Sequence, residues 1–106
     1  MAKNVGNTVT AMPSRESIAT SAIVTSDGTA LAANDNRSGW HIQNLDDAAV
    51  YVKLGAGVSA SDFSFVLKAG TAANDGNGGS FGDNSYTGIV TIAAATGNPR
   101  VVVVSY

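Results

Sequence analysis

Short segments that alternate apolar and polar residues recur along this chain, and turn-forming residues separate them about every 8 to 12 positions. In residues 39–44, Trp40 and Ile42 share one face of an extended chain and polar side chains share the other, and residues 49–54 alternate similarly. Residues 18–25, 63–67, 86–92 and 100–106 contain β-branched or aromatic residues and are further strand candidates. No segment has the period of an amphipathic helix of useful length. We therefore expect an all-β protein, a small β-sandwich or jelly-roll-like barrel with an extended N-terminal arm.

The chain divides into an arm and a body. Residues 1–17 are polar, lack periodicity and contain Met12-Pro13, and the Asn-Asp-Asn run at 34–36 favours local side-chain bonds over a strand ladder. We place the arm at residues 1–38 and the sandwich body at 39–106. Within the body, the first two strong segments should pair as a hairpin around the turn at 45–48.

The last segment contains four consecutive valines, residues 101–104. A strand that is apolar on both faces is expected to be covered on both. One cover would be the core, and the other would be a second subunit or the arm.

The composition argues against several classes of partner. Only 13% of residues are charged, the net charge is −2, and six Lys and Arg residues are scattered along the chain. Nucleic-acid binding needs a basic stripe that this pattern lacks, and no run approaches the roughly 20 apolar residues that span a bilayer. The first residues also lack the apolar core of a signal peptide. We expect no nucleic-acid and no membrane partner.

The size of the body and the absence of cysteine point to an oligomer. Without cysteine, disulfides, zinc-thiolate sites and thiol nucleophiles are excluded. A β body this small buries a modest fraction of its surface, so association is the remaining source of stability.

Catalytic chemistry has little support in the sequence. His41 is the single histidine and lies in an alternating segment, so a surface or interface position is the ordinary interpretation. Asp46 and Asp47 are adjacent turn residues that point apart in an extended chain. We expect no enzyme and no catalytic residues.

The segment DGNGGSFGDN, residues 75–84, concentrates oxygen-bearing side chains and glycines. It lacks the glutamate and the flanking helices of an EF-hand, although Asp75, Asn77 and Asp83 could form an irregular cation site. Glycine next to Asn and Asp more often marks a tight change of direction. We interpret the loop at 71–85 as a connection between strands that is enlarged to make contacts. We assign no metal and no cofactor to the chain, and the sequence leaves open whether residues 75–84 bind an ion or a glycan.

A longer pattern covers residues 30–106. It comprises Ala30-Leu-Ala-Ala-Asn-Asp-Asn-Arg37, Ile42-Gln-Asn44, Val50-Tyr-Val-Lys-Leu-Gly55, Ser59-Ala-Ser-Asp-Phe63, Leu67-Lys-Ala-Gly70 and Tyr86-Thr-Gly-Ile-Val90. This order resembles small virion structural proteins of tailed bacteriophages. Many of those proteins pass briefly from Leu-x-Ala-Gly to Tyr-x-Gly, whereas this chain inserts DGNGGSFGDN.

The resemblance implies a β-sandwich that coats or joins parts of a virion, and within that class we favour a capsid decoration (cement) protein. Such proteins are commonly trimeric and carry an extended arm, so the implied partners are the major capsid protein lattice and further copies of the chain. The implied location is the capsid surface of the virion, and the host cytoplasm before assembly. The residues expected in the capsid-contact arm are Val5, Val9, Ile18, Ile23, Val24 and Arg37, with Arg37 more suited to fixing the arm to the body. Those expected at a subunit interface are Phe81, Val101, Val103 and Tyr106.

Two alternatives stay open on the sequence. The protein could be a tail or fibre-base component, since the pattern does not separate head from tail. It could also be a carbohydrate-binding module of a tail fibre, with residues 75–84 and the aromatics Trp40, Tyr51 and Tyr106 as its site.

Overall fold

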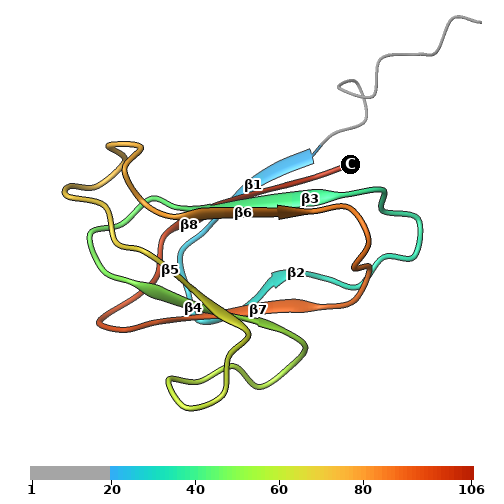
Figure 1. Ribbon diagram of the computed structural model, residues 1–106, viewed down its shortest axis with the longest axis horizontal. Coiled ribbons are helices and arrows are strands. Elements are labelled where there is room, and N and C mark those ends of the chain that lie inside the picture. Colours follow the sequence, from blue (N-terminus) through green and yellow to red (C-terminus); the bar gives the residue numbers. More distant parts are fainter. Residues whose placement is uncertain (1–19) are drawn as a thin grey trace, which may run out of the picture.

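Eight β-strands and no helix make up residues 20–106, the part of the chain that the computed structural model describes (Figure 1). The strands are β1 (Thr20–Val24), β2 (Gly28–Leu31), β3 (Trp40–Asn44), β4 (Val50–Leu54), β5 (Phe65–Leu67), β6 (Ser80–Asp83), β7 (Val90–Ala94) and β8 (Val101–Ser105). β-branched and aromatic residues supply most of the buried strand positions, as expected for side chains that pack on a pleated surface.

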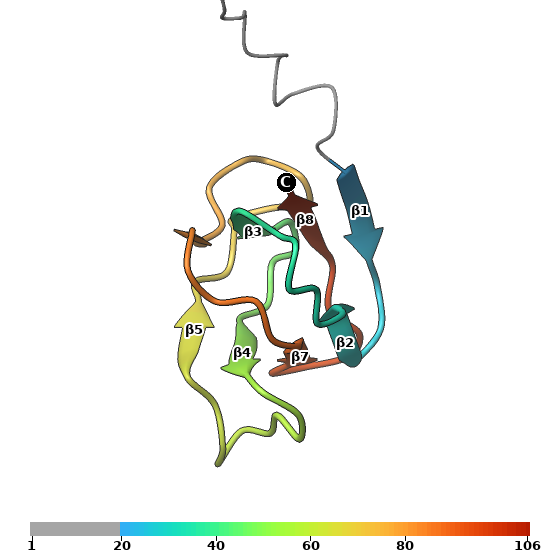
Figure 2. The same ribbon diagram turned by 90° about the vertical axis from the view of Figure 1, so that its right-hand side faces the viewer.

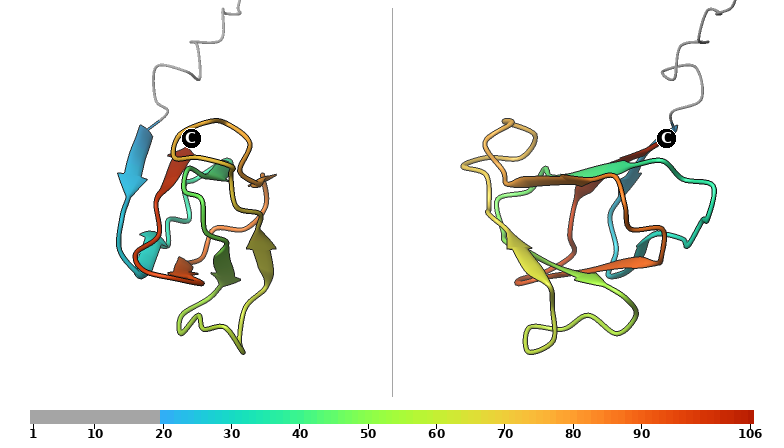
Figure 3. Two further views of the ribbon diagram at one scale, coloured as in Figure 1. Left: turned by 90° about the vertical axis from the view of Figure 1, so that its left-hand side faces the viewer. Right: turned by 45° about the vertical axis from the view of Figure 1, so that its right-hand side comes forward.

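The strands form two antiparallel sheets that lie face to face, as Figure 2 and Figure 3 show from the side. Sheet A has the strand order β1-β8-β3-β6, and sheet B has the order β2-β7-β4-β5. The pairs β1–β8, β2–β7, β3–β6 and β4–β5 are nested, so the chain follows one long hairpin that is folded over on itself. This is a jelly-roll arrangement, and it confirms the expected all-β sandwich.

The hydrophobic core lies between the sheets and is built from alternate strand positions. Its members are at most 3% exposed and are Trp40, Ile42, Val50, Val52, Leu67, Val90, Ile92, Val101 and Val103. Burying one Val, Leu or Ile side chain contributes about 1.5–3 kcal/mol relative to leaving it in water. The core therefore dominates the stability of the sandwich.

The four valines of β8 occupy two environments. Val101 and Val103 belong to the core, whereas Val102 and Val104 are half-buried on the opposite face. The expectation that Val101 and Val103 lie at a subunit interface is therefore wrong. Strand alternation assigns the odd positions to the core, and a run of identical residues conceals which positions these are.

β3 and β4 do not pair, so the expected hairpin is wrong. β3 pairs with β8 and β6, while β4 pairs with β5 and β7. Asn44, which is 1% exposed, donates from its side-chain amide to the carbonyls of Ala48 at 2.8 Å and Lys68 at 3.2 Å, and its Oδ1 accepts from the Asp46 amide at 2.9 Å. These bonds hold the β3–β4 connection, residues 45–49, as an arch that crosses from sheet A to sheet B.

Part of the expected arm belongs to the sandwich. β1 and β2 contribute an edge strand to sheet A and to sheet B, so the boundary between arm and body does not fall at residue 38. The expected contact residues Val5, Val9 and Ile18 lie outside the described residues.

The segment 75–84 is likewise part strand. Ser80–Asp83 form β6 and pair with β3, placing Phe81 opposite Ile42. The interpretation of the whole segment as a loop is therefore corrected, and only residues before Ser80 belong to the connection from β5.

Candidate interaction surface

β1 is exposed on both faces. Residues 20–23 are exposed and only Val24 is half-buried. In the register with β8, Ala22 lies opposite the core residue Val103, while Ile23 lies opposite the outer residue Val102. The inner and outer faces of β1 therefore both contact solvent, and the strand is attached by backbone pairing with β8 and by Val24, which packs against the core.

The second edge of β1 has no strand partner among residues 20–106, because β1 ends the order of sheet A. The other edge strands are shorter, and β2 has a register shift between Thr29 and Leu31. β1 has five residues and contains no charge, proline or irregularity. Charges, bulges and shortness are the usual protection of sheet edges, so β1 is the edge best suited to accept an added strand.

An apolar strip lies on the outer face of sheet A next to this edge. We call Ile23, Val102 and Val104 the outer strip; Ile23 is 50% exposed, and the two valines are half-buried. Beyond β8, His41 of β3 lies opposite Val104 with its side chain exposed, so polar residues bound the strip. The run of four valines predicted an outward apolar face, and the register of β8 shows that Val102 and Val104 form it.

Arg37 is buried and joins two connections. Only 7% of the residue is exposed, and its Nη1 donates to the Ala32 carbonyl at 2.9 Å. Its Nη2 donates to the carbonyls of Gly88 at 2.8 Å and Tyr86 at 3.1 Å. This agrees with the expected role in fixing the N-terminal part to the body. Its side chain is not available to an outside partner, so its place among the capsid-contact residues is wrong.

Asp75 organises the connection between β5 and β6. Its carboxylate accepts from the Thr71 hydroxyl, from the amides of Thr71 at 2.9 Å and Ala72 at 2.8 Å, and from the Asn77 amide at 2.9 Å. The Thr71 hydroxyl first, and then the Asn77 amide, hold the pKa of Asp75 well below its usual value. The carboxylate oxygens are thus engaged within the loop.

Asp83 has a similar local role at the end of β6. Its carboxylate accepts from the Tyr86 amide at 2.7 Å and from the Ser85 amide at 3.1 Å, and these bonds lower its pKa. Residues 20–106 bring together no group of three or more His, Asp or Glu side chains that could hold a metal ion. Asp75 and Asp83 each accept hydrogen bonds within their own turn.

Two glycines of this segment are required by close packing. A Cβ at Gly78 would collide with the carbonyl oxygen of Asn44, and one at Gly79 would lie 2.6 Å from the Lys68 amide nitrogen. The same connection donates the Asn74 amide to the Leu45 carbonyl at 2.7 Å. The glycine content serves contact between the connection and the sandwich.

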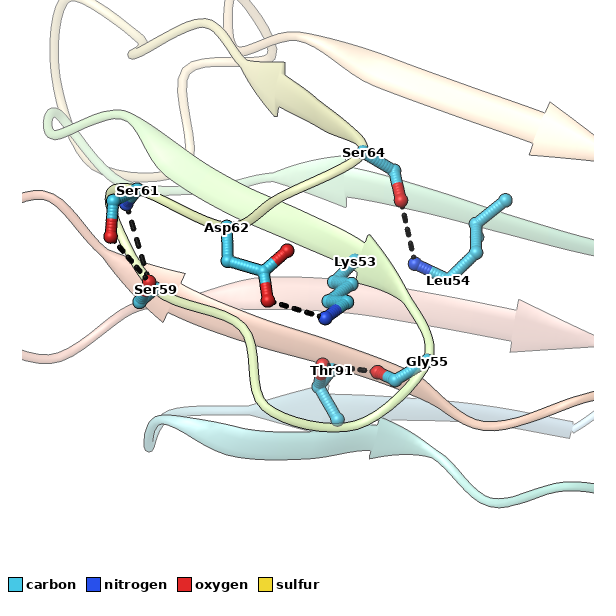
Figure 4. Close-up of polar contacts among 8 residues, drawn as sticks. All are labelled: Lys53, Leu54, Gly55, Ser59, Ser61, Asp62, Ser64 and Thr91. Atoms are coloured by element: carbon cyan, nitrogen blue, oxygen red, sulfur yellow. Dashed lines mark hydrogen bonds and ion pairs between the residues drawn. The ribbon is translucent and has the colours of Figure 1, made fainter.

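The β4–β5 connection, residues 55–64, lies over the outer face of sheet B (Figure 4). Lys53 Nζ and Asp62 Oδ2 form an ion pair at 2.6 Å, and the Thr91 hydroxyl donates to the Gly55 carbonyl at 2.6 Å. An ion pair this exposed contributes at most about 1 kcal/mol. The contacts fix the course of the connection.

A second apolar patch, formed by Tyr51, Phe63 and Val66, lies beside this connection. Phe63 and Val66 are 41% and 43% exposed, and the ring centroids of Tyr51 and Phe63 are 4.9 Å apart. Tyr51 and Val66 are cross-strand neighbours. This patch lies on sheet B, away from the outer strip.

The remaining aromatic residues do not form a platform for a ligand. Trp40 is fully buried, Tyr51 belongs to sheet B, and Tyr106 is 40% exposed at the end of β8. Phe81, expected at a subunit interface, packs on Trp40 and Phe65 with ring centroids 5.7 and 4.4 Å apart. It is 36% exposed and closes the gap between β5 and β6.

No family model matches the chain, and no curated protein and no solved structure was found to be similar to it. The described strands and connections include no helix that could cross a membrane.

Proposed function

We propose that this protein is a structural, non-enzymatic virion protein of a tailed bacteriophage. In this proposal it is a capsid decoration (cement) protein that binds the major capsid protein lattice and stabilises the icosahedral head as a homotrimer. It would reside on the capsid surface after a period in the host cytoplasm.

The observation that carries the proposal is the open edge of β1. An uncharged strand with both faces and one edge in solvent can add an extended segment of a partner through main-chain hydrogen bonds. A capsid lattice repeats such a segment many times, so even weak single contacts add up through effective concentration. The expected contact residues Ile23 and Val24 both lie in this strand.

Two further features support the proposal. The jelly roll is common among viral capsid domains, although it also occurs in lectins and other proteins and does not by itself decide function. The pattern over residues 30–106 resembles small phage virion proteins. The outer-strip valines, Val102 and Val104, replace Val101 and Val103 as the residues proposed to contact another copy.

Binding to expanded empty heads of the phage that encodes the protein tests this function. The full chain should bind saturably, at a fixed number of copies per head, and should raise the temperature at which the heads fall apart. A variant that starts at residue 18 keeps β1 and measures the contribution of residues 1–17. If the full chain does not bind the heads but binds host cells or glycans, the result would instead support a tail-fibre module.

A further inference from the structure

The pair Asn77-Gly78 is the one place in the chain where glycine directly follows asparagine. The side-chain amide of an asparagine can be attacked by the backbone nitrogen of the next residue, and glycine obstructs this attack least because it has no Cβ. The other asparagines precede larger residues, and Asn98 precedes a proline, which has no N–H. Asn77 is therefore the asparagine most open to this attack.

The fold leaves both reacting groups without strong hydrogen bonds. Asn77 is exposed and lies outside the strands. Its side-chain nitrogen is 3.3 Å from Thr71 Oγ1 and 3.4 Å from Asp75 Oδ2, which is long for a hydrogen bond. The Asn77 backbone amide donates to Asp75 Oδ1 at 2.9 Å, and the Gly79 amide donates to a backbone carbonyl at 2.8 Å. The Gly78 amide between them donates to no acceptor within residues 20–106, so no such bond has to break before its nitrogen attacks.

We propose that Asn77 is a site of spontaneous deamidation. The Gly78 nitrogen bonds to Asn77 Cγ, and the side-chain NH2 leaves as ammonia together with the proton of the Gly78 nitrogen, which gives a succinimide ring. Water then opens the ring at either carbonyl. The product is aspartate or isoaspartate, in which the main chain runs through the side-chain carboxyl group. The reaction consumes only water, and it does not depend on the proposed function.

Either product weakens the contact between this connection and the sandwich. In the aspartate product, a carboxylate replaces the amide that contacts Asp75, and the two like charges repel. Asp75 is ionised at neutral pH, because the Thr71 hydroxyl and further donors hold its pKa well below the usual value. Isoaspartate lengthens the main chain just before Gly78, where even a Cβ would collide with the Asn44 carbonyl oxygen. Deamidation therefore lowers the stability of the protein.

Incubation of the full chain in mildly alkaline buffer, followed by peptide mapping with mass spectrometry, tests the proposal. Asn77 should convert from amide to acid at least about ten-fold faster than the exposed Asn98, and its product should include isoaspartate. The rate at Asn77 in the folded protein should lie within about ten-fold of the rate in urea, because a site that the fold protects reacts only after local opening. A smaller advantage over Asn98, a larger protection by the fold, or a product without isoaspartate overturns the proposal.

Three variants complete the test without changing Gly78. Asn77→Ser removes the reactive amide and should abolish the mass change in its peptide, and a change that persists there overturns the proposal. Asn77→Asp reproduces one product and should lower the thermal unfolding midpoint by about 2–4 °C. Asn98→Asp makes the same charge change at another exposed residue and should shift the midpoint by less than about 1 °C. Equal shifts in these two variants would overturn the inferred loss of stability at Asn77.

Discussion

Phe65 and Phe81 lie with their ring centroids 4.4 Å apart although they belong to different sheets. Phe65 comes from the edge strand of sheet B and Phe81 from the edge strand of sheet A, so the two rings close this side of the sandwich. The opposite side, between β1 and β2, has no such aromatic pair in the described chain. The sandwich is therefore closed at one side and has its exposed strand, β1, at the other.

Replacing Phe81 with alanine should lower the free energy of unfolding by about 2–3 kcal/mol. That is below the about 3–5 kcal/mol of a fully buried phenylalanine, because Phe81 keeps 36% of its surface exposed. Urea unfolding measures the change. A double-mutant cycle with Phe65→Ala should show a coupling of about 0.5–1.5 kcal/mol, and purely additive effects would contradict the role of the pair.

Replacing Asn44 with alanine should lower the free energy of unfolding by about 1–3 kcal/mol, since it removes the side-chain donor to the Ala48 carbonyl and one of the two donors to the Lys68 carbonyl, whose other donor is the Gly79 amide. Asn36→Ala, at an exposed position, is the control and should cost less than about 0.5 kcal/mol. Similar losses in the two variants would mean that the arch does not depend on the Asn44 amide.

The stability of the protein should fall in acid through Asp75. Its pKa in the folded protein is lowered by the Thr71 hydroxyl and the Asn77 amide, so the ionised form stabilises the fold at pH above the ordinary value of 3.8. This contribution is lost as the pH falls below that value toward the folded-state pKa. Urea midpoints measured between about pH 2 and 6 should show a larger loss in the wild type than in Asp75→Asn, in which the contribution of Asp83 remains. Asp47→Asn, an equal charge change at an exposed turn residue, should keep it.

Replacing Val104 with lysine should convert the proposed trimer into monomers, because it puts a charge at one of the two valines proposed to contact another copy. Sedimentation equilibrium measures the mass, and Val66→Lys on sheet B is the matched control. A Val104→Lys protein that remains trimeric while folded would place the subunit contact elsewhere.

Local patterns predicted six of the eight strands and missed β2 and β6, whereas pairing and facing were determined by contacts distant in sequence. The alternation of Trp40 and Ile42 with polar residues is a local property, and it placed β3 correctly. The separation of β3 and β4 into different sheets depends on bonds from Asn44 across to the end of β5, and a turn composition cannot reveal them. The sequence did not predict β6, because Gly82 and the neighbouring glycines interrupt the alternation of apolar and polar residues that indicates a strand.

The candidate surface was predicted only in part. Ile23 and Val24 were placed among the contact residues from their β-branched segment, and both lie in the exposed edge strand. Arg37 was expected both to contact the capsid and to fix the arm to the body, and because its side chain is buried only the second role is compatible with the structure. Val102 and Val104 could not be distinguished from Val101 and Val103 before the register with β1 and β3 was known.

The central claim is that the β1 edge binds the capsid, and binding of Ile23→Lys to expanded empty heads tests it most directly. Ile23 is 50% exposed, so the variant should fold, and Val66→Lys introduces the same charge at a 43% exposed site on sheet B. Ile23 also belongs to the outer strip, so both variants must retain the thermal unfolding midpoint and the sedimentation mass of the wild type before their binding is compared. We predict that Ile23→Lys loses at least about ten-fold in affinity, equivalent to about 1.4 kcal/mol, while Val66→Lys binds like the wild type. Equal binding by all three proteins would contradict the role of β1 in capsid attachment.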